Sequence, residues 1–63
     1  MCESNAYFRR EGREELVLSD IARVTFEGDQ IVLTGVLGNQ KKVRAEIVEF
    51  DLMGHKLILR ERR

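Results

Sequence analysis

The sequence predicts a small all-β domain, and the pattern of its glycines is the first reason. The chain has 63 residues with five glycines and no proline. Four glycine-containing segments separate runs rich in β-branched and other apolar residues, which is typical of tight turns between strands. They are Glu11-Gly12, Glu27-Gly28-Asp29, Leu37-Gly38-Asn39 and Met53-Gly54-His55. Four turns imply at least five strands.

Alternation of apolar residues within the runs is the second reason. Residues 5–10 form the first expected strand, which carries Ala6, Tyr7 and Phe8. Residues 14–18 form the next, and a regular strand places Leu16 and Leu18 on one face with Val17 opposite.

The third expected strand covers residues 21–26. Ser19-Asp20, just before it, is compatible with a brief connection or with the N-cap of a helix. Strict alternation that places Ala22, Val24 and Phe26 on one face favours a strand over a helix.

The second half of the chain predicts one straight and one bent strand. Residues 30–36 place Ile31 and Leu33 on one face and Val32 on the other, and Gly35 indicates a bulge or a close approach. In residues 42–52 the apolar phase slips once. Val43, Ala45 and Ile47 share one face, and Val48, Phe50 and Leu52 share the next. A long strand should therefore bulge at Ile47-Val48 and curl from one sheet into another.

A final strand over residues 56–60 turns Leu57 and Leu59 inward and Ile58 outward. Five or six short antiparallel strands with one sharply coiled member predict an SH3-like or Sm-like barrel, with residues 1–63 forming one domain. A domain this small buries only about 60% of its unfolded surface, so a second copy would add stability. Val17, Val32 and Ile58, with either Tyr7 or Phe8, are expected to face away from the core, which favours a homodimer.

The balance of charged residues argues against some classes of function. Eleven basic residues balance eleven acidic ones, so the chain lacks the basic excess of a dedicated nucleic-acid binder. Two basic clusters, Lys41-Lys42-Arg44 and Arg60-Arg62-Arg63, could form an RNA-binding face with Tyr7 and Phe8, but interleaved acidic residues favour cross-strand ion pairs instead. We find no pattern of catalytic residues and expect the chain not to be an enzyme.

The first residues of the chain, Met1-Cys2-Glu3-Ser4-Asn5, carry no secretion signal, and no apolar run is long enough to span a membrane. We therefore expect a cytoplasmic protein. Cys2 is the single cysteine, and a reducing compartment keeps its thiol free for metal or redox chemistry.

Cys2 is the sharpest chemical feature of the sequence. If Met1 is removed, the amine and thiolate of Cys2 close a chelate ring and the Glu3 amide nitrogen adds another; if Met1 is kept, its amine and the Cys2 amide and thiolate chelate equally well. Such N and S donors select nickel(II) or copper(II), and because a thiolate reduces copper(II), nickel is preferred. A two-fold axis near Cys2 would complete the coordination with the same atoms from a second chain, giving one metal per dimer.

His55 is expected to be a solvated turn residue, with a role as an extra ligand as the alternative.

Three segments of the chain resemble the CooT family. They are Met1-Cys2-Glu3-Ser4-Asn5-Ala6-Tyr7, Glu15-Leu16-Val17-Leu18 and the stretch from Leu33-Thr34-Gly35 to Val43-Arg44-Ala45. Members of that family are small dimeric nickel-binding accessory proteins associated with carbon monoxide dehydrogenase maturation, and some relatives are labelled as RNA-binding. The resemblance implies an SH3-like or Sm-like dimer in which Cys2 is the Ni(II) ligand at the interface. Glu3 is expected to contribute only its backbone nitrogen.

Overall fold

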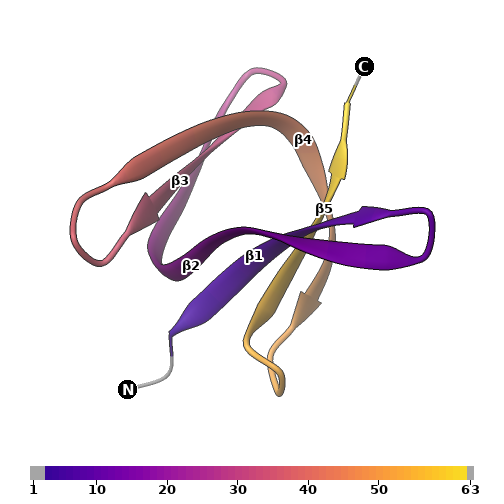
Figure 1. Cartoon of the computed structure of the whole chain (residues 1–63). Coiled ribbons are helices and arrows are strands. Elements are labelled where there is room, and N and C mark those ends of the chain that lie inside the picture. The colour runs from indigo at the N-terminus through magenta and orange to yellow at the C-terminus, as the bar shows by residue number, and fades with distance from the viewer. Residues whose placement is uncertain (1–2, 63) are drawn as a thin grey trace.

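The chain forms a closed barrel of five strands in the computed structural model, which describes residues 3–62 (Figure 1). This architecture confirms the predicted small all-β barrel. The strands are β1 (Ser4–Arg10), β2 (Arg13–Glu27), β3 (Gln30–Gly35), β4 (Gln40–Asp51) and β5 (Lys56–Glu61). All four predicted turns join consecutive strands.

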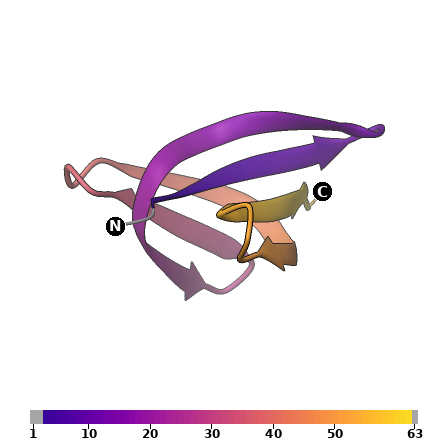
Figure 2. The same cartoon turned by 90° about the horizontal axis from the view of Figure 1, so that it is seen from below.

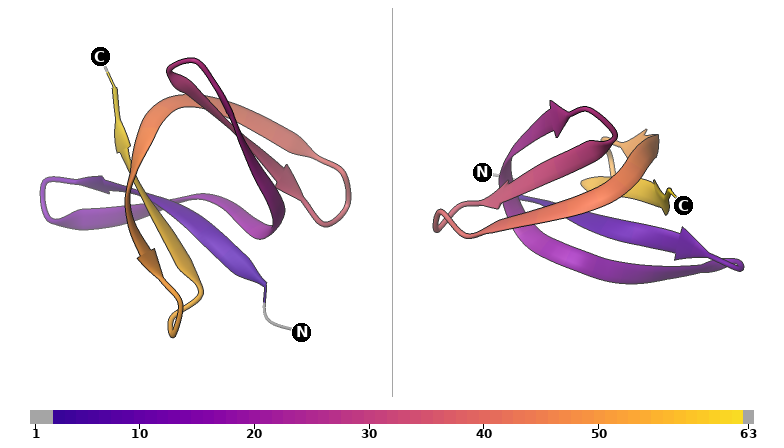
Figure 3. Two further views of the ribbon diagram at one scale, coloured as in Figure 1. Left: turned by 180° about the vertical axis from the view of Figure 1, so that it is seen from behind. Right: turned by 90° about the horizontal axis from the view of Figure 1, so that it is seen from above.

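Each strand pairs with its neighbour in the sequence, and these four pairings are antiparallel. The barrel is closed by β1 and β5, which run parallel from Asn5 opposite Lys56 to Phe8 opposite Leu59. The β1–β2 hairpin continues beyond this pairing and projects past the rest of the barrel (Figure 2 and Figure 3).

β2 is one continuous strand through Ser19-Asp20, where the sequence suggested a connection or a helix N-cap. The strand bends sharply there because Asp20 adopts a left-handed conformation (φ 54°), which aspartate tolerates better than most residues. The register shifts on both sides of the bend, before Ala6 on β1 and between Ile21 and Arg23 on β2. The two expected strands are therefore the two arms of a single bent strand.

β4 confirms the predicted bulge. Its first residues pair with β3 and its later residues pair with β5, and the register shifts between Ile47 and Glu49, which leaves Val48 as the extra residue. The strand thus passes from one part of the barrel wall to another, as the slip in apolar phase indicated.

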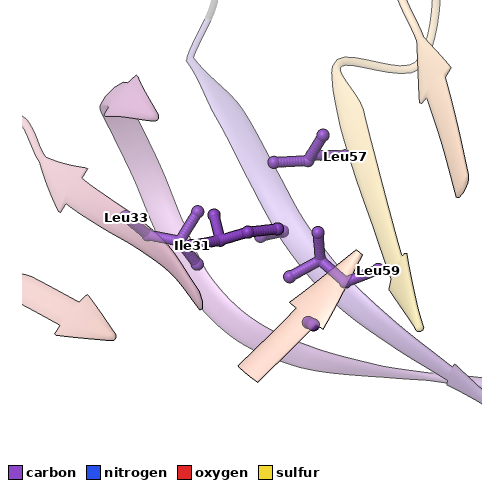
Figure 4. Packing of buried hydrophobic residues seen from close by; sticks show 6 residues of the cluster. Ile31, Leu33, Leu57 and Leu59 are labelled. Atoms are coloured by element: carbon purple, nitrogen blue, oxygen red, sulfur yellow. The ribbon is translucent and has the colours of Figure 1, made fainter. Parts of the chain in front are cut away.

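The core is small and entirely apolar. Figure 4 shows Ile31 and Leu33 of β3 facing Leu57 and Leu59 of β5 across the barrel interior. Ala6 and Ala45 complete the buried cluster, and their small side chains let the strands approach closely. Seven half-buried apolar side chains pack around it: Phe8, Val17, Leu18, Ile21, Val24, Val43 and Ile47.

The face prediction for residues 14–18 was wrong. Both Val17 and Leu18 pack against the core, whereas Leu16 is 59% exposed. The reason is a register shift, because Leu18 lies opposite Ala6 while Leu16 lies opposite the next residue, Tyr7. Val17 is the extra residue, so the alternation that a regular strand would keep is lost there.

Val32 and Ile58 do face away from the core, but they do not form the unpartnered surface that was expected to require a second copy. Val32 is 5% exposed and Ile58 is 1% exposed. Ile58 lies between Tyr7 and Glu49 on the neighbouring strands, and Val32 lies between Thr25 and Lys42. Because both are almost fully buried within one chain, side chains of the same molecule cover them.

Candidate functional site

The predicted metal-binding residues lie where the chain enters β1. Cys2 lies outside the described residues, and Glu3 is exposed immediately before the strand. The backbone nitrogen of Asn5 donates a hydrogen bond of 3.0 Å to the carbonyl oxygen of His55. The start of β1 is therefore fixed against the β4–β5 turn.

Asn5 also fixes the entry of the chain against β2. Its Oδ1 accepts a hydrogen bond of 3.1 Å from the backbone nitrogen of Asp20, at the bend of β2. The carbonyl oxygen of Asp20 accepts a bond of 2.9 Å from the nitrogen of Val36, which follows β3. The bend would otherwise leave these backbone groups without ladder partners. Four segments thus meet around the start of β1.

His55 lies close to the start of the chain through its backbone. It has a left-handed φ of 56° in the β4–β5 turn, and its side chain is half-buried. Its spacing in the sequence did not place it near the start of the chain, and the hydrogen bond from Asn5 now places its main chain beside the start of β1. Within residues 3–62 the imidazole makes no hydrogen bond or ion pair with another residue, so its role as an extra ligand stays the alternative to that of a turn residue.

Within the described part of the chain, no three histidine, cysteine, aspartate or glutamate side chains are arranged to hold a metal ion. Residues 3–62 of one copy therefore do not supply a preformed metal site of that kind. A metal held at this end of the barrel would need donors from the first residues, from backbone nitrogen, or from a second chain.

The basic clusters are paired with carboxylates, in agreement with the expectation of cross-strand ion pairs. Lys42 lies 3.3 Å from Glu27, and Arg44 binds Asp29 at 2.8 Å. In the second cluster, Arg60 and Arg62 both contact Glu46. The positive charge of these residues is thus partly neutralised at the surface.

A network of ion pairs spans the outer face of β1, β2, β4 and β5. Glu14 accepts bonds from Arg9 at 3.3 Å and from Lys56 at 3.2 Å, and Arg9 also reaches Glu49 at 3.1 Å. The hydrogen bond from Lys56, followed by that from Arg9, holds the pKa of Glu14 below its usual range. The bond from Arg60 likewise lowers the pKa of Glu46. Ile58 lies opposite Glu49, a member of this network, on the neighbouring strand.

A pocket of about 280 Å³ lies at the far ends of β1 and β5, away from the start of the chain. Its lining is charged and consists of Arg9, Arg10, Glu11, Arg60 and Glu61. Arg10 is already paired with Glu15 at 2.8 Å and with Glu61 at 2.9 Å. Since all three arginines have carboxylate partners, the pocket offers little uncompensated charge for a ligand.

Two turns beside the start of β1 expose large apolar side chains that sequence reasoning did not single out as functional. The β3–β4 turn presents Val36 and Leu37, and the β4–β5 turn presents Leu52 and Met53. Leu37 and Met53 are more than nine-tenths exposed. The signal was present in the sequence, because Leu37 and Met53 stand directly before turn glycines where polar residues are usual.

We find no helix in residues 3–62 that is long and apolar enough to cross a membrane.

Comparisons with known proteins agree with the fold. A solved structure, the crystal structure of a candidate CooT from Carboxydothermus hydrogenoformans, superposes with a TM-score of 0.91 at 24% sequence identity, covering 98% of this chain and all of that one. At that identity the similarity establishes the shared barrel. Relatives include an uncharacterized protein from Archaeoglobus fulgidus, 40% identical over 42 residues, which make up 67% of this chain and 93% of that protein. Uncharacterized protein MJ1551 from Methanocaldococcus jannaschii is 32% identical over 59 residues, or 94% of this chain and 96% of that one.

The family comparison covers nearly the whole chain. Residues 1–60 match the model of the CO dehydrogenase accessory protein CooT. An accessory protein assists an enzyme, which confirms the expectation that this chain is not an enzyme itself. The match includes the opening Met1-Cys2-Glu3 segment, the first four strands and β5 up to Arg60. The chain belongs to the CooT family of CO dehydrogenase accessory proteins.

Proposed function

We propose that the protein is a nickel(II)-binding accessory protein, a metallochaperone or nickel reservoir, with carbon monoxide dehydrogenase as its candidate client. The observation that carries this proposal is the family match over residues 1–60, which begins with the segment that holds the only cysteine. The exposed position of Glu3 next to a fixed β1 supports it, because the residue that directly follows Cys2 in the sequence is held at a defined end of the barrel.

Cys2 and the first backbone nitrogens are the proposed ligands. A thiolate together with amine and amide nitrogens suits nickel(II), which accepts square-planar geometry. Glu3 would contribute its backbone nitrogen, and its side chain would stay in solvent. This donor set does not depend on a cluster of side chains within the barrel, and residues 3–62 hold none.

A homodimer would complete the site. One chain start offers two or three donors, and a second copy related by a two-fold axis would bring an identical set to the same ion. One nickel ion would then bind per two chains. Ligands at an exposed end of a rigid barrel release metal readily, which suits delivery or storage better than catalysis.

We place this activity in the cytoplasm. The proposed chemistry requires a free thiolate, and a reducing compartment keeps a single cysteine in that form.

Isothermal titration of nickel(II) into protein with its native first residues tests the proposal. We expect about one metal per two chains, with release of protons from the thiol and amide on binding. Cys2→Ser should abolish that binding, and a tag joined ahead of Met1 should weaken it because the free amine is lost. Unchanged nickel affinity in Cys2→Ser would overturn the assignment.

His55→Asn is the matched control for this titration. Asparagine tolerates the positive φ of residue 55 and keeps the backbone carbonyl that accepts from Asn5. The variant should fold and bind nickel with the affinity of the wild type. A large loss of affinity would add the imidazole to the ligand set.

An RNA-binding barrel is the alternative that the sequence left open. The carboxylate partners of Lys42 and Arg44 weigh against it. Filter binding of single-stranded RNA at two salt concentrations separates the two functions, because contacts to phosphates weaken steeply as salt rises. We expect no salt-dependent binding, and no effect of removing Lys41, Lys42 and Arg44.

A further inference from the structure

Within residues 3–62, two residues other than glycine adopt a left-handed backbone conformation outside the β1–β2 turn. They are Asp20 (φ 54°), in the middle of β2, and His55 (φ 56°), the last residue of the β4–β5 turn. Aspartate and histidine tolerate this region better than most residues, but it is sparsely populated, and a chain keeps it only where the surrounding contacts impose it. Strained backbone of this kind gathers at functional sites, where it sets a shape in advance of binding. What fixes these two residues therefore bears on function.

Asn5 contacts both strained residues. Its backbone nitrogen donates a hydrogen bond of 3.0 Å to the carbonyl oxygen of His55, and its Oδ1 accepts one of 3.1 Å from the backbone nitrogen of Asp20. A third bond of 2.9 Å, from the nitrogen of Val36 to the carbonyl oxygen of Asp20, secures the bend from its other side. Figures 1 and 3 show the start of β1 beside this bend of β2. We name these four residues and their three hydrogen bonds the Asn5 frame.

The Asn5 frame lies directly after the proposed metal ligands in the chain. Ser4 is the first residue of β1 and pairs with Ile21, just after the bend of β2. Glu3 is therefore one residue from a paired strand and two residues from Asn5, a span of about 7 Å at full extension. The backbone nitrogen of Glu3 is one of the proposed nickel donors. The frame thus limits where that nitrogen can lie.

We infer that Asn5 is a positioning residue for nickel binding. Its two hydrogen bonds fix the backbone that leads to Glu3 before the metal arrives, so that binding does not have to order it. Ordering a free backbone costs conformational entropy, and a site that is ordered in advance binds more tightly by that amount. Asn5 acts through the chain and is not itself a ligand, because its backbone nitrogen and its Oδ1 are both engaged by the protein. This inference rests on the proposed function, since it concerns the same site.

The Asn5 frame can be weakened without dismantling the barrel. β1 pairs with β2 from Ala6 to Arg10 and with β5 from Asn5 to Phe8, and neither pairing needs the Asn5 side chain. The buried cluster consists of apolar residues from β1, β3, β4 and β5 and does not include Asn5. Loss of its side-chain oxygen should therefore free the start of β1 and the bend of β2 while the core stays packed. A variant at this position can separate positioning from folding.

Isothermal titration of nickel(II) into protein with its native first residues tests the inference. Asn5→Ala should raise the dissociation constant for nickel by about 5- to 30-fold, which corresponds to ordering one backbone residue on binding, and should keep the stoichiometry of the wild type. Asn5→Asp keeps an acceptor oxygen and should recover most of the affinity in added salt, which screens its new charge.

Val43→Ala is the matched control for this titration. Val43 is half-buried on β4 opposite Ile31, so the variant loses packing against the core but leaves the Asn5 frame intact. It should bind nickel with the affinity of the wild type.

A second variant reaches the same site from another strand. Asp20→Val places a β-branched residue where φ is positive, which such residues resist, so the bend should relax and Oδ1 of Asn5 should lose its partner. We expect a loss of nickel affinity similar to that of Asn5→Ala, and the double variant should lose little more than either single variant because both remove the same hydrogen bond. Asp20→Asn tolerates the left-handed conformation and should bind nickel as the wild type does.

A readout without metal measures the positioning directly. In NMR relaxation of the metal-free protein, the amides of Glu3 and Ser4 should lose order in Asn5→Ala, with order parameters falling toward the range of flexible chain, below about 0.6. The amides of β3 should stay near the value of rigid backbone, about 0.85. Unchanged order of Glu3 and Ser4 in this variant would contradict the positioning role.

The outcomes separate this inference from the proposed function. Nickel bound through Cys2 with an affinity that Asn5→Ala and Asp20→Val leave unchanged would overturn the inference alone. An equal loss of affinity in Val43→Ala would do the same, because it would assign the effect to general stability. A loss matched by weaker self-association of the metal-free variants in sedimentation equilibrium would assign it to assembly and also overturn the inference. Nickel affinity that is unaffected by Cys2→Ser would instead overturn the proposed function, and the inference would fall with it.

Discussion

The side-chain oxygen of Asn5 accepts a hydrogen bond of 3.1 Å from the backbone nitrogen of Asp20, which joins the entry of the chain to the sharpest bend in the barrel. This one contact ties β1 to the point where β2 turns from pairing with β1 to pairing with β3. It also positions the segment that leads to the proposed metal ligands.

Removing that oxygen should weaken the barrel. Asn5→Ala leaves the Asp20 nitrogen without its protein partner, and we expect a loss of about 1 kcal/mol in the free energy of unfolding, measured with urea. Asn5→Asp keeps an acceptor oxygen and should recover most of the loss. Equal stability of the alanine variant and the wild type would show that water replaces the bond without cost.

Ile58 tests whether a buried side chain that points away from the core stabilises the fold as much as a core residue does. Although it points away from the core, it is 1% exposed, so Ile58→Ala should cost about 2–4 kcal/mol, as for a core residue. Leu16→Ala, at an exposed position on the same outer face, should cost much less. Thermal and urea unfolding of the two variants would check the contrast. Similar small losses would mean that the ion-pair network does not shield Ile58 in solution.

The turn glycine at position 35 should resist substitution. In Gly35→Ala the new methyl group would meet the Asn39 amide, and we expect a loss of about 1–2 kcal/mol, typical of modest overpacking. Combining it with Asn39→Ala should relieve the clash, so the double variant should be more stable than the sum of the single losses predicts. Strict additivity in a double-mutant cycle would contradict direct contact between the two residues.

Stability should fall in acid for a defined reason. Lys56 and Arg9 lower the pKa of Glu14 in the folded chain. The ionised Glu14 therefore stabilises the fold at pH values above the pKa of an unfolded-chain glutamate, about 4.3. This stabilisation is lost as the pH falls through the lower pKa of the folded chain. Urea midpoints measured from neutral pH down to about pH 3 should decline less steeply in Glu14→Gln than in the wild type.

Salt provides the control for the same network. Added sodium chloride should reduce the difference between Glu14→Gln and the wild type at neutral pH, because the partners are exposed and their attraction is screened. A difference independent of both salt and pH would assign the effect of Glu14 to packing instead.

Much of this fold could be predicted from the sequence, because it depends on interactions between residues that are close in the chain. The glycine turns, the inward positions of Ile31, Leu33, Leu57 and Leu59, and the bulge at Val48 follow from alternation and from the conformations that turns require. These features depend on near neighbours in the chain. The candidate ligands Cys2 and Glu3 were likewise visible as residue types, since chelation by a chain start is a property of adjacent atoms.

Long-range geometry decided the rest. Sequence could not show that β2 continues through Asp20, because the left-handed bend is held by Asn5 fifteen residues earlier and by Val36 sixteen residues later. Nor could it show that Ile58 is covered by side chains from other strands, or that two apolar turns lie on either side of the start of β1. Period-two patterns report which face a residue occupies; only the closed barrel determines what lies over that face and which distant segments meet at its end.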